Sequence, residues 1–230
     1  MDAIARNWKA LNERVADAAE RAGRSASEIT IVAVTKTRTA DEVSAALAAG
    51  VTDVGENRVQ EAASKREQVT GVARWHMVGQ LQRNKAGQAV DIFDVVHSVD
   101  GSRLADALAR RAAEAEREIE VLLQVNTSGA AQQAGVEMAA FPALLEHVAG
   151  LDHLRLRGLM TIAAHSDDVE VIRSCFARLG DLAQKHRQTD SVRLDVLSMG
   201  MSGDFEIAIE MGATMIRVGT VLFGERSSRG

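Results

Sequence analysis

The sequence is poor in residues that several classes of protein require. Among its 230 residues is one cysteine, Cys175, which excludes an internal disulfide framework and a cysteine-rich zinc site. Tyrosine is absent and aromatic residues make up only 3%, so no mechanism can use a tyrosine of this sequence as acid or base. The one proline, Pro142, stands where a helical pattern begins, a position at which its missing N–H costs little.

Charge and hydropathy exclude further classes. The 27 basic and 32 acidic residues give a net charge of −5, whereas a nucleic-acid-binding domain is usually basic. No apolar run approaches the roughly 18 residues of a membrane span. The N-terminal stretch lacks the apolar core of a secretory signal and is richer in acidic residues than a transit peptide. We therefore expect a cytoplasmic protein with neither a nucleic acid nor a membrane as its partner.

Apolar runs that alternate with helical patterns predict the fold. Eight runs lie at residues 29–34, 52–57, 75–79, 93–99, 120–126, 154–162, 193–200 and 214–219. Helical patterns between them include residues 41–50, 102–117, 141–150 and 171–187. The runs are nearly all apolar, as in a parallel sheet covered on both faces. Eight units, and no G-x-G-x-x-G after the first run, favour a closed (β/α)8 TIM barrel over an open doubly wound sheet.

The first residues predict one further helix. Apolar residues recur at helical spacing over residues 1–23, at Ile4, Trp8, Leu11, Val15, Ala18 and Ala22. Its polar face is mixed rather than basic, which favours packing on the protein over attachment to a membrane. We predict one α/β domain over residues 1–230, with this N-terminal helix packed on the barrel of a monomer. Pairing of the helix with a second copy is the alternative.

Chemistry in a barrel lies at the C-terminal ends of the strands, so polar residues there are candidates. Lys36 follows the first run directly. Desolvation at the barrel mouth would make its amine available as a Schiff-base nucleophile. The alternative, which position alone favours, is that the stem packs and the ammonium reaches water. Lys65, Lys85 and Lys185 lie in helical or loop contexts, where we expect them in solvent.

Two residues near the next strand ends have ordinary structural explanations. Asn57 follows the second run and could cap the next helix. His76 lies inside the third apolar run, where a histidine is more often a satisfied core residue than a ligand. No two histidines have the spacing of metal ligands, so we predict no metal site.

Small residues follow the last two runs, in the segments LSMGMSGD and RVGT. Such loops expose backbone N–H groups, and barrels commonly bind phosphate after strands seven and eight. Ordinary turn formation would explain either loop alone. Together with Lys36, the two loops indicate either pyridoxal phosphate or a phosphorylated sugar, the latter as in a Schiff-base aldolase.

Five motifs together resemble the pyridoxal phosphate homeostasis protein family, whose members look like the N-terminal barrel of alanine racemase. The motifs are AVTKT, GENRVQE, WHMVGQLQRNK, GLMTI and LSMGMSGDFEIAIEMGATMIRVGTVLFG. The resemblance covers about residues 29–224. The sequence departs from the family pattern at residues 37–39 and at Gln80, where the family often has a proline. Both positions are in predicted loops.

The resemblance implies a pyridoxal 5′-phosphate (PLP) site. Lys36 would hold the cofactor as an imine, and Arg217 would face the pyridine nitrogen. Asn57, His76 and Met160 would line the ring. The phosphate would be bound by N–H and hydroxyl groups of Ser198, Gly200, Met201, Ser202, Gly219 and Thr220.

The implied function is that of a carrier. A guanidinium beside the ring nitrogen disfavours protonation of that nitrogen and weakens the cofactor as an electron sink. Racemases of this fold also use a tyrosine from a second domain, for which this sequence has neither the residue nor the length. We expect a non-catalytic protein of PLP homeostasis that releases PLP to apo-enzymes. A weakly active PLP-dependent amino-acid racemase and a Schiff-base aldolase are the alternatives.

Overall fold

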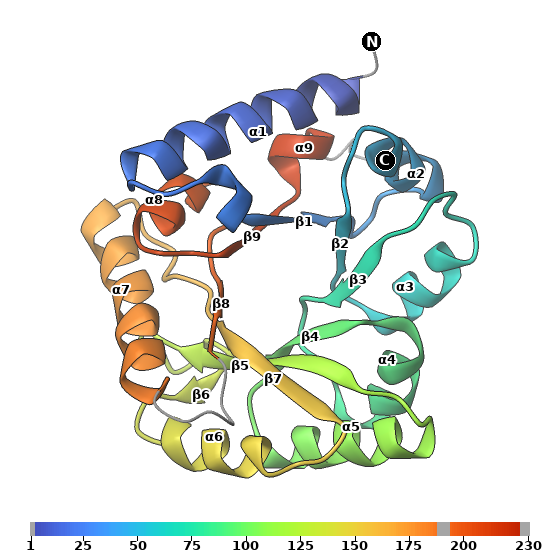
Figure 1. Ribbon diagram of the computed structural model, residues 1–230, viewed down its shortest axis with the longest axis vertical. Helices are drawn as coiled ribbons and strands as arrows, with labels where there is room; N and C mark the ends of the chain where they lie inside the picture. The colour runs from blue at the N-terminus through green and yellow to red at the C-terminus, as the bar shows by residue number, and fades with distance from the viewer. Residues whose placement is uncertain (1–2, 188–193, 226–230) are drawn as a thin grey trace.

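Eight parallel strands form a closed barrel in the computed structural model, which describes residues 3–187 and 194–225 (Figure 1). The barrel strands are β1 (Thr30–Val34), β2 (Asp53–Glu56), β3 (Arg74–Met77), β4 (Val95–Val99), β5 (Ile119–Asn126), β7 (Leu154–Met160), β8 (Val196–Ser198) and β9 (Met215–Val218). Each strand pairs with its neighbours in parallel, and the β1–β9 and β4–β5 pairs close the ring. The predicted (β/α)8 barrel is therefore confirmed.

Helices surround the strands in the order that the sequence patterns predict. They are α1 (Ala3–Arg21), α2 (Ala40–Ala48), α3 (Val59–Arg66), α4 (Ala86–Ile92), α5 (Ser102–Glu114), α6 (Phe141–Ala149), α7 (Val169–His186), α8 (Phe205–Glu210) and α9 (Thr220–Phe223). A two-residue strand that the sequence did not predict, β6 (Val136–Glu137), pairs with the end of β5. The predicted seventh strand begins at residue 193, which lies outside the described residues.

Local sequence determines where several helices begin. The Thr39 hydroxyl accepts the N–H of Glu42, whose carboxylate accepts the N–H of Thr39, and this capping box starts α2. Pro142 lies in the first turn of α6, as predicted. Asp168 accepts the N–H of Glu170 at 2.9 Å and caps α7.

The core has two parts, one on each side of the barrel wall. The larger part fills the space between the strands and the surrounding helices. The smaller part is an apolar cluster of Val95, Leu122 and Met160. Since side chains alternate in direction along a strand, the remaining inward positions of the barrel must also be filled. Several of these positions carry polar side chains, which form the interior part of the site described below.

The N-terminal helix packs on the barrel, as predicted. Figure 1 shows α1 lying across α8 and α9. Its buried face includes Leu11 and Val15, and burial of each such side chain contributes about 1.5–3 kcal/mol. An ion pair also joins α1 to α8, in which the Arg14 guanidinium lies 2.9 Å from the Glu206 carboxylate. The helix therefore covers α8 and α9, the helices that follow β8 and β9.

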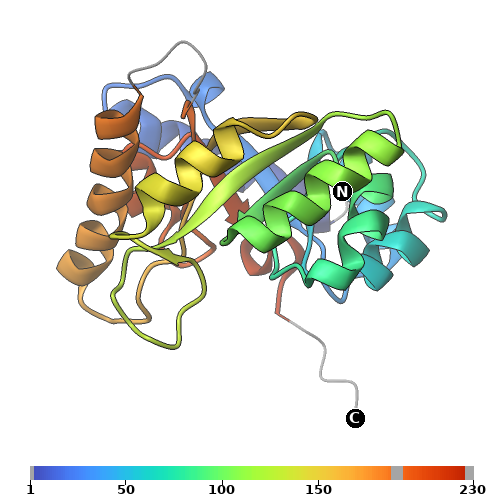
Figure 2. The same ribbon diagram turned by 90° about the horizontal axis from the view of Figure 1, so that it is seen from below.

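The view from the side shows the loop between β5 and α6 projecting from one end of the barrel (Figure 2). Gly135 in this loop has a φ of 124°, and a Cβ there would lie 2.6 Å from the backbone nitrogen of Asn126. Only glycine allows the loop to pass so close to the end of β5. Over residues 3–187 and 194–225, no helix is both long enough and apolar enough to cross a membrane.

Candidate functional site

Lys36 lies in a turn held from both sides. Thr35, which precedes it, is fully buried, and its hydroxyl donates a 2.6 Å hydrogen bond to Oε1 of Glu56. Thr37, which follows it, has a φ of 65°, and its N–H donates to the Glu61 carboxylate. Lys36 itself is exposed. The structure therefore bears out the alternative that position alone favours, in which the end of the Lys36 side chain reaches water.

The cation beneath this turn is Lys65. The prediction that Lys65 lies in solvent is wrong. Its side chain is 7% exposed, and its Nζ donates to the carbonyl oxygen of Thr35 at 2.7 Å and to Glu61 at 3.0 Å. It also pairs with the Glu56 carboxylate. Burial raises the pKa of Glu56, against the opposing hydrogen bonds from Lys65 and Thr35. Lys65 is thus a structural cation that supports the Lys36 turn.

The loops after β8 and β9 are joined through one hydroxyl. Oγ of Ser202 accepts the N–H groups of Gly219 at 3.2 Å and Val221 at 3.4 Å. Because this oxygen already accepts two hydrogen bonds, its own proton is available to another acceptor. Among the described residues, the backbone N–H groups of Ser202, Gly203 and Thr220 have no hydrogen-bond partner. These donors fit a phosphate, which accepts several hydrogen bonds.

Two other predicted phosphate ligands shape the loop after β8. Gly200 is buried with a φ of 92°, and a Cβ there would lie 2.6 Å from the Cβ of Ala208, so this position needs glycine. Met201 is exposed, but its N–H donates to Oδ1 of Asp204 at 2.5 Å. Since that donor is already used, the predicted phosphate contact of the Met201 N–H does not fit the geometry.

Ser198 points into the barrel rather than toward these loops. It is fully buried, and its Oγ lies 2.7 Å from Nη1 of Arg217 and 3.1 Å from Nδ1 of His97. Nη2 of Arg217 donates to the carbonyl oxygen of Thr161 at 2.9 Å. Burial lowers the pKa of Arg217 to about 10, so the side chain is a cation at neutral pH. Because the interior uses the Ser198 hydroxyl, its predicted hydrogen bond to phosphate does not fit.

The residues predicted to line the ring divide into two groups. Asn57 is half-buried at the barrel mouth, and a Cβ on Gly79 would lie 2.4 Å from its carbonyl oxygen. Arg58 is the N-cap of α3, so the interpretation of Asn57 as the cap is wrong. His76 and Met160 occupy inward positions of β3 and β7 and are almost fully buried. His76 is thus a satisfied core histidine, which does not fit the ring-lining role.

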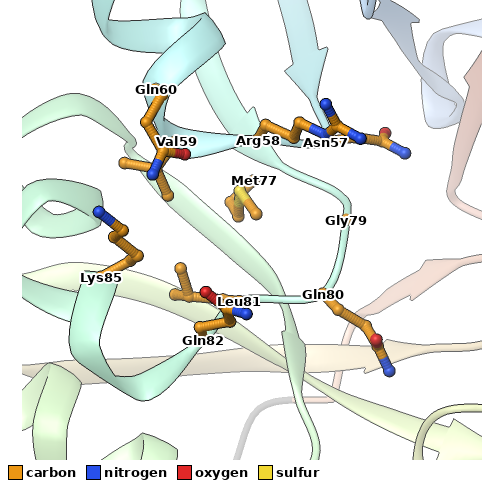
Figure 3. A pocket seen from close by; sticks show the side chains of 10 residues that line it. All are labelled: Asn57, Arg58, Val59, Gln60, Met77, Gly79, Gln80, Leu81, Gln82 and Lys85. Carbon is orange, nitrogen blue, oxygen red and sulfur yellow. The ribbon is translucent and has the colours of Figure 1, made fainter.

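A polar pocket of about 400 Å³ lies beside Asn57. Lys85 stands across it from Asn57 and Arg58, with Met77 between them and the side chain of Gln80 pointing away (Figure 3). Arg58 and Lys85 are the two cationic residues that line the pocket. The pocket therefore extends the barrel mouth with two positive charges.

Sequence reasoning missed Asp53, His97 and Thr161, which contact the predicted residues from inside the barrel. The available signal for His97 is a polar residue within an apolar run, the same signal that His76 gives. No group of three or more His, Cys, Asp or Glu side chains could hold a metal ion among residues 3–187 and 194–225.

Comparison with known proteins first identifies the class. The family model for the alanine racemase N-terminal domain matches residues 1–227. The pyridoxal phosphate homeostasis protein of Pseudomonas aeruginosa is 40% identical over 227 residues, covering 98% of this chain and 97% of that protein. Its counterpart in Escherichia coli is 39% identical over 232 residues, covering 98% of each. The chain belongs to the pyridoxal phosphate homeostasis protein family.

Solved structures agree with this membership. PipY of Synechococcus elongatus, determined with PLP bound, has a TM-score of 0.85 and 38% identity, covering 96% of this chain and all of that one. A protein from Bifidobacterium adolescentis has a TM-score of 0.92 and 37% identity, covering 96% and 94%. An alanine racemase from Clostridium difficile has a TM-score of 0.69, 17% identity and coverage of 88% and 53%, and shows the fold alone.

Proposed function

We propose that this protein binds PLP at the C-terminal mouth of its barrel, holds it reversibly on Lys36 and releases it to apo-enzymes. The observation that carries this proposal is the pair of linked loops, where Ser202, Gly203 and Thr220 present hydrogen-bond donors without partners. Relatives named for PLP homeostasis and the PLP-bound PipY support the identity of the ligand.

The phosphate is assigned to the loops after β8 and β9. The free N–H groups of Ser202, Gly203 and Thr220 and the free hydroxyl proton of Ser202 would bind it. Gly200 shapes this loop through its positive φ rather than through a contact. Gly219 brings the two loops together by donating its N–H to Ser202.

The amine is assigned to Lys36. When bound, PLP supplies an aldehyde that reacts reversibly with a primary amine. The turn around Lys36 is fixed from below by Thr35 and Glu61, while the lysine itself stays accessible to water. Such access suits exchange of the bound molecule, whereas carbanion chemistry benefits from a site that excludes water.

Arg217 supports a carrier rather than a catalyst. Its guanidinium is buried and positively charged at neutral pH, so it can donate a hydrogen bond to the ring nitrogen but cannot accept a proton from it. Most carbanion chemistry of this cofactor needs a protonated ring nitrogen, which a carboxylate favours and an arginine does not. The sequence also contains no tyrosine that could act as a second base.

The visible spectrum of the purified protein tests the binding proposal. Reconstitution with PLP should give a yellow protein whose visible band disappears on borohydride reduction, and peptide mapping should place the reduced adduct on Lys36. Lys36→Ala should lose the band. Lys85→Ala, which removes the lysine of the neighbouring pocket, should keep it. An adduct on Lys85, or a protein that takes up a sugar phosphate but not PLP, would contradict the assignment.

Transfer to an apo-enzyme tests the homeostasis proposal. The PLP-loaded protein is freed of unbound cofactor and mixed with a PLP-dependent enzyme stripped of its own. Activity of that enzyme should recover as the visible band of this protein declines. Retention of all the cofactor over many hours would overturn the carrier role without affecting the binding assignment.

A further inference from the structure

A continuous series of polar side chains crosses the barrel interior. Nε2 of His76 lies 2.9 Å from Oδ1 of Asp53, and its Nδ1 lies 2.9 Å from Nε2 of His97. The other nitrogen of His97, Nδ1, lies 3.1 Å from Oγ of Ser198, which accepts a 2.7 Å hydrogen bond from Arg217. We call these five residues the interior network. It links Asp53, the first residue of β2, to Arg217 of β9.

The two ends of the interior network determine the direction of the hydrogen bonds that Arg217 and Asp53 form. A guanidinium only donates, so Ser198 accepts from Arg217 and has its own proton left to give. A carboxylate only accepts, so Nε2 of His76 carries the proton that faces Asp53. Hydrogen bonds from His76 and Thr52 outweigh the effect of burial and lower the pKa of Asp53, which keeps this end ionised.

With both rings neutral, the middle of the interior network has one fully paired arrangement. With Nε2 of His76 protonated, its Nδ1 accepts from Nε2–H of His97, and Nδ1 of His97 accepts from the Ser198 hydroxyl. Burial, followed by the nearby His76, Arg217 and Arg74, lowers the pKa of His97 well below its usual range, so this ring is neutral. All protons therefore point from Arg217 toward Asp53.

Burial makes this arrangement strict. His76, His97 and Ser198 are fully buried, and Arg217 is 5% exposed. An unpaired polar group there would lose water without gaining a partner, which makes any other tautomer costly. At the Asp53 end, Arg74 and Arg157 share the one carboxylate of Glu120, so two positive charges face a single negative charge there.

We propose that His97 and Asp53 are positioning residues that orient the Ser198 hydroxyl and, through it, the Arg217 guanidinium toward the cofactor site. Arg217 has two hydrogen-bond acceptors in the structure, Ser198 and the Thr161 carbonyl. The interior network supplies the first of these in a fixed orientation. This inference rests on the proposed function, because it takes Arg217 as the group that faces the PLP ring.

One consequence separates the roles of two serines. The Ser198 hydroxyl donates to His97 and accepts from Arg217, so it has no proton for a phosphate. The Ser202 hydroxyl accepts two N–H groups and keeps its proton free. Ser202 therefore serves the phosphate, while Ser198 holds the arginine.

The first test needs no cofactor. In the apo-protein labelled with ¹⁵N-histidine, imidazole nitrogen shifts should show His97 neutral and protonated at Nε2 at pH 7. Ser198→Ala should alter the Nδ1 signal of His97 more than that of His76. An Nδ1-protonated or charged His97 in the wild-type protein would overturn the proposal, whatever the protein binds.

The second test compares His97→Leu with His97→Gln. Leucine cannot hydrogen-bond to Ser198 or His76, whereas an amide offers one donor and one acceptor. We expect His97→Leu to weaken PLP binding about tenfold, as for one loosened hydrogen bond to a charged group, and to shift the visible band of the bound cofactor. His97→Gln should recover part of both effects.

The matched control is Ser98→Ala, the adjacent residue on β4. Ser98 is also buried, but its Oγ has no hydrogen-bond partner in the described structure, so its loss should leave band and affinity unchanged. If His97→Leu folds and behaves like Ser98→Ala in both measurements, the proposal fails. If it does not fold, the nitrogen shifts of the wild type still decide. Failure of the proposed function would look different, because the wild type itself would then bind no PLP.

Discussion

The ammonium group of Lys65 lies 2.7 Å from the carbonyl oxygen of Thr35, the residue immediately before Lys36. This contact places a buried cation directly beneath the turn that carries the proposed cofactor lysine. The same ammonium pairs with both Glu56 and Glu61, so one side chain both shares its charge between two carboxylates and supports the turn. Stability and cofactor binding are therefore coupled at Lys65.

Replacement of Lys65 by methionine should destabilise the fold. The variant leaves the buried Glu56 carboxylate without its cation, and loss of one partner of a buried pair costs about 3–5 kcal/mol. Urea denaturation of the apo-protein measures this loss. Lys185→Met, at an exposed lysine, should change the free energy of unfolding by less than about 0.5 kcal/mol. Adding Glu56→Gln to Lys65→Met should restore part of the loss. Equal stabilities of Lys65→Met and Lys185→Met would contradict the role of Lys65.

Replacement of Gly219 by aspartate should remove the affinity for PLP. The new carboxylate would add a negative charge beside the loops after β8 and β9, at a cost of about 3 kcal/mol, or roughly a hundredfold in Kd. Gly219→Ala separates charge from size, because a Cβ there lies 3.3 Å from the carbonyl oxygen of Val34. Fluorescence or absorbance titration gives both affinities. Pyridoxal without phosphate should bind the wild type far more weakly, and equal binding of the two forms would count against the phosphate assignment.

The PLP-loaded protein should exchange the Cα hydrogen of amino acids only slowly. Arg217 opposes protonation of the ring nitrogen, and general acid–base help of the kind that a tyrosine would supply is typically worth about 10²–10⁴-fold in rate. Incubation with L-alanine in deuterated water, followed by NMR, measures this exchange. Rates near those of ordinary enzymes, about 1–10³ s⁻¹, would favour the racemase alternative.

Stability should decrease as the pH falls below the ordinary histidine pKa of 6.5, and His97 should account for part of the decrease. Burial lowers the pKa of His97 in the folded state, so the unfolded chain takes up a proton there first. The contribution of His97 to the free energy of unfolding is therefore complete above pH 6.5. It declines below that pH by up to about 1.4 kcal/mol per pH unit. Denaturation at several pH values should show a shallower decline in His97→Gln than in Ser98→Ala, and identical slopes would contradict this account.

Sequence patterns predicted the parts of this protein that depend on neighbouring residues. Eight apolar runs with helices between them predicted the barrel, and the first residues predicted a helix that packs on it. Position at a strand end, together with the family motifs, selected Lys36 and the loops around Ser202 and Gly219. Such features repeat at short spacing, because strands, helices and turns form from local periodicity.

Tertiary structure alone decided which side chains meet inside the barrel. His97 and Ser198 are separated by 101 residues, and only closure of the ring brings β4 and β8 within hydrogen-bond distance. The same closure buries Lys65 against Glu56 and turns Ser198 away from the phosphate loops. Burial then forces each enclosed polar group to find a partner, and those partners are residues that no local pattern could have selected.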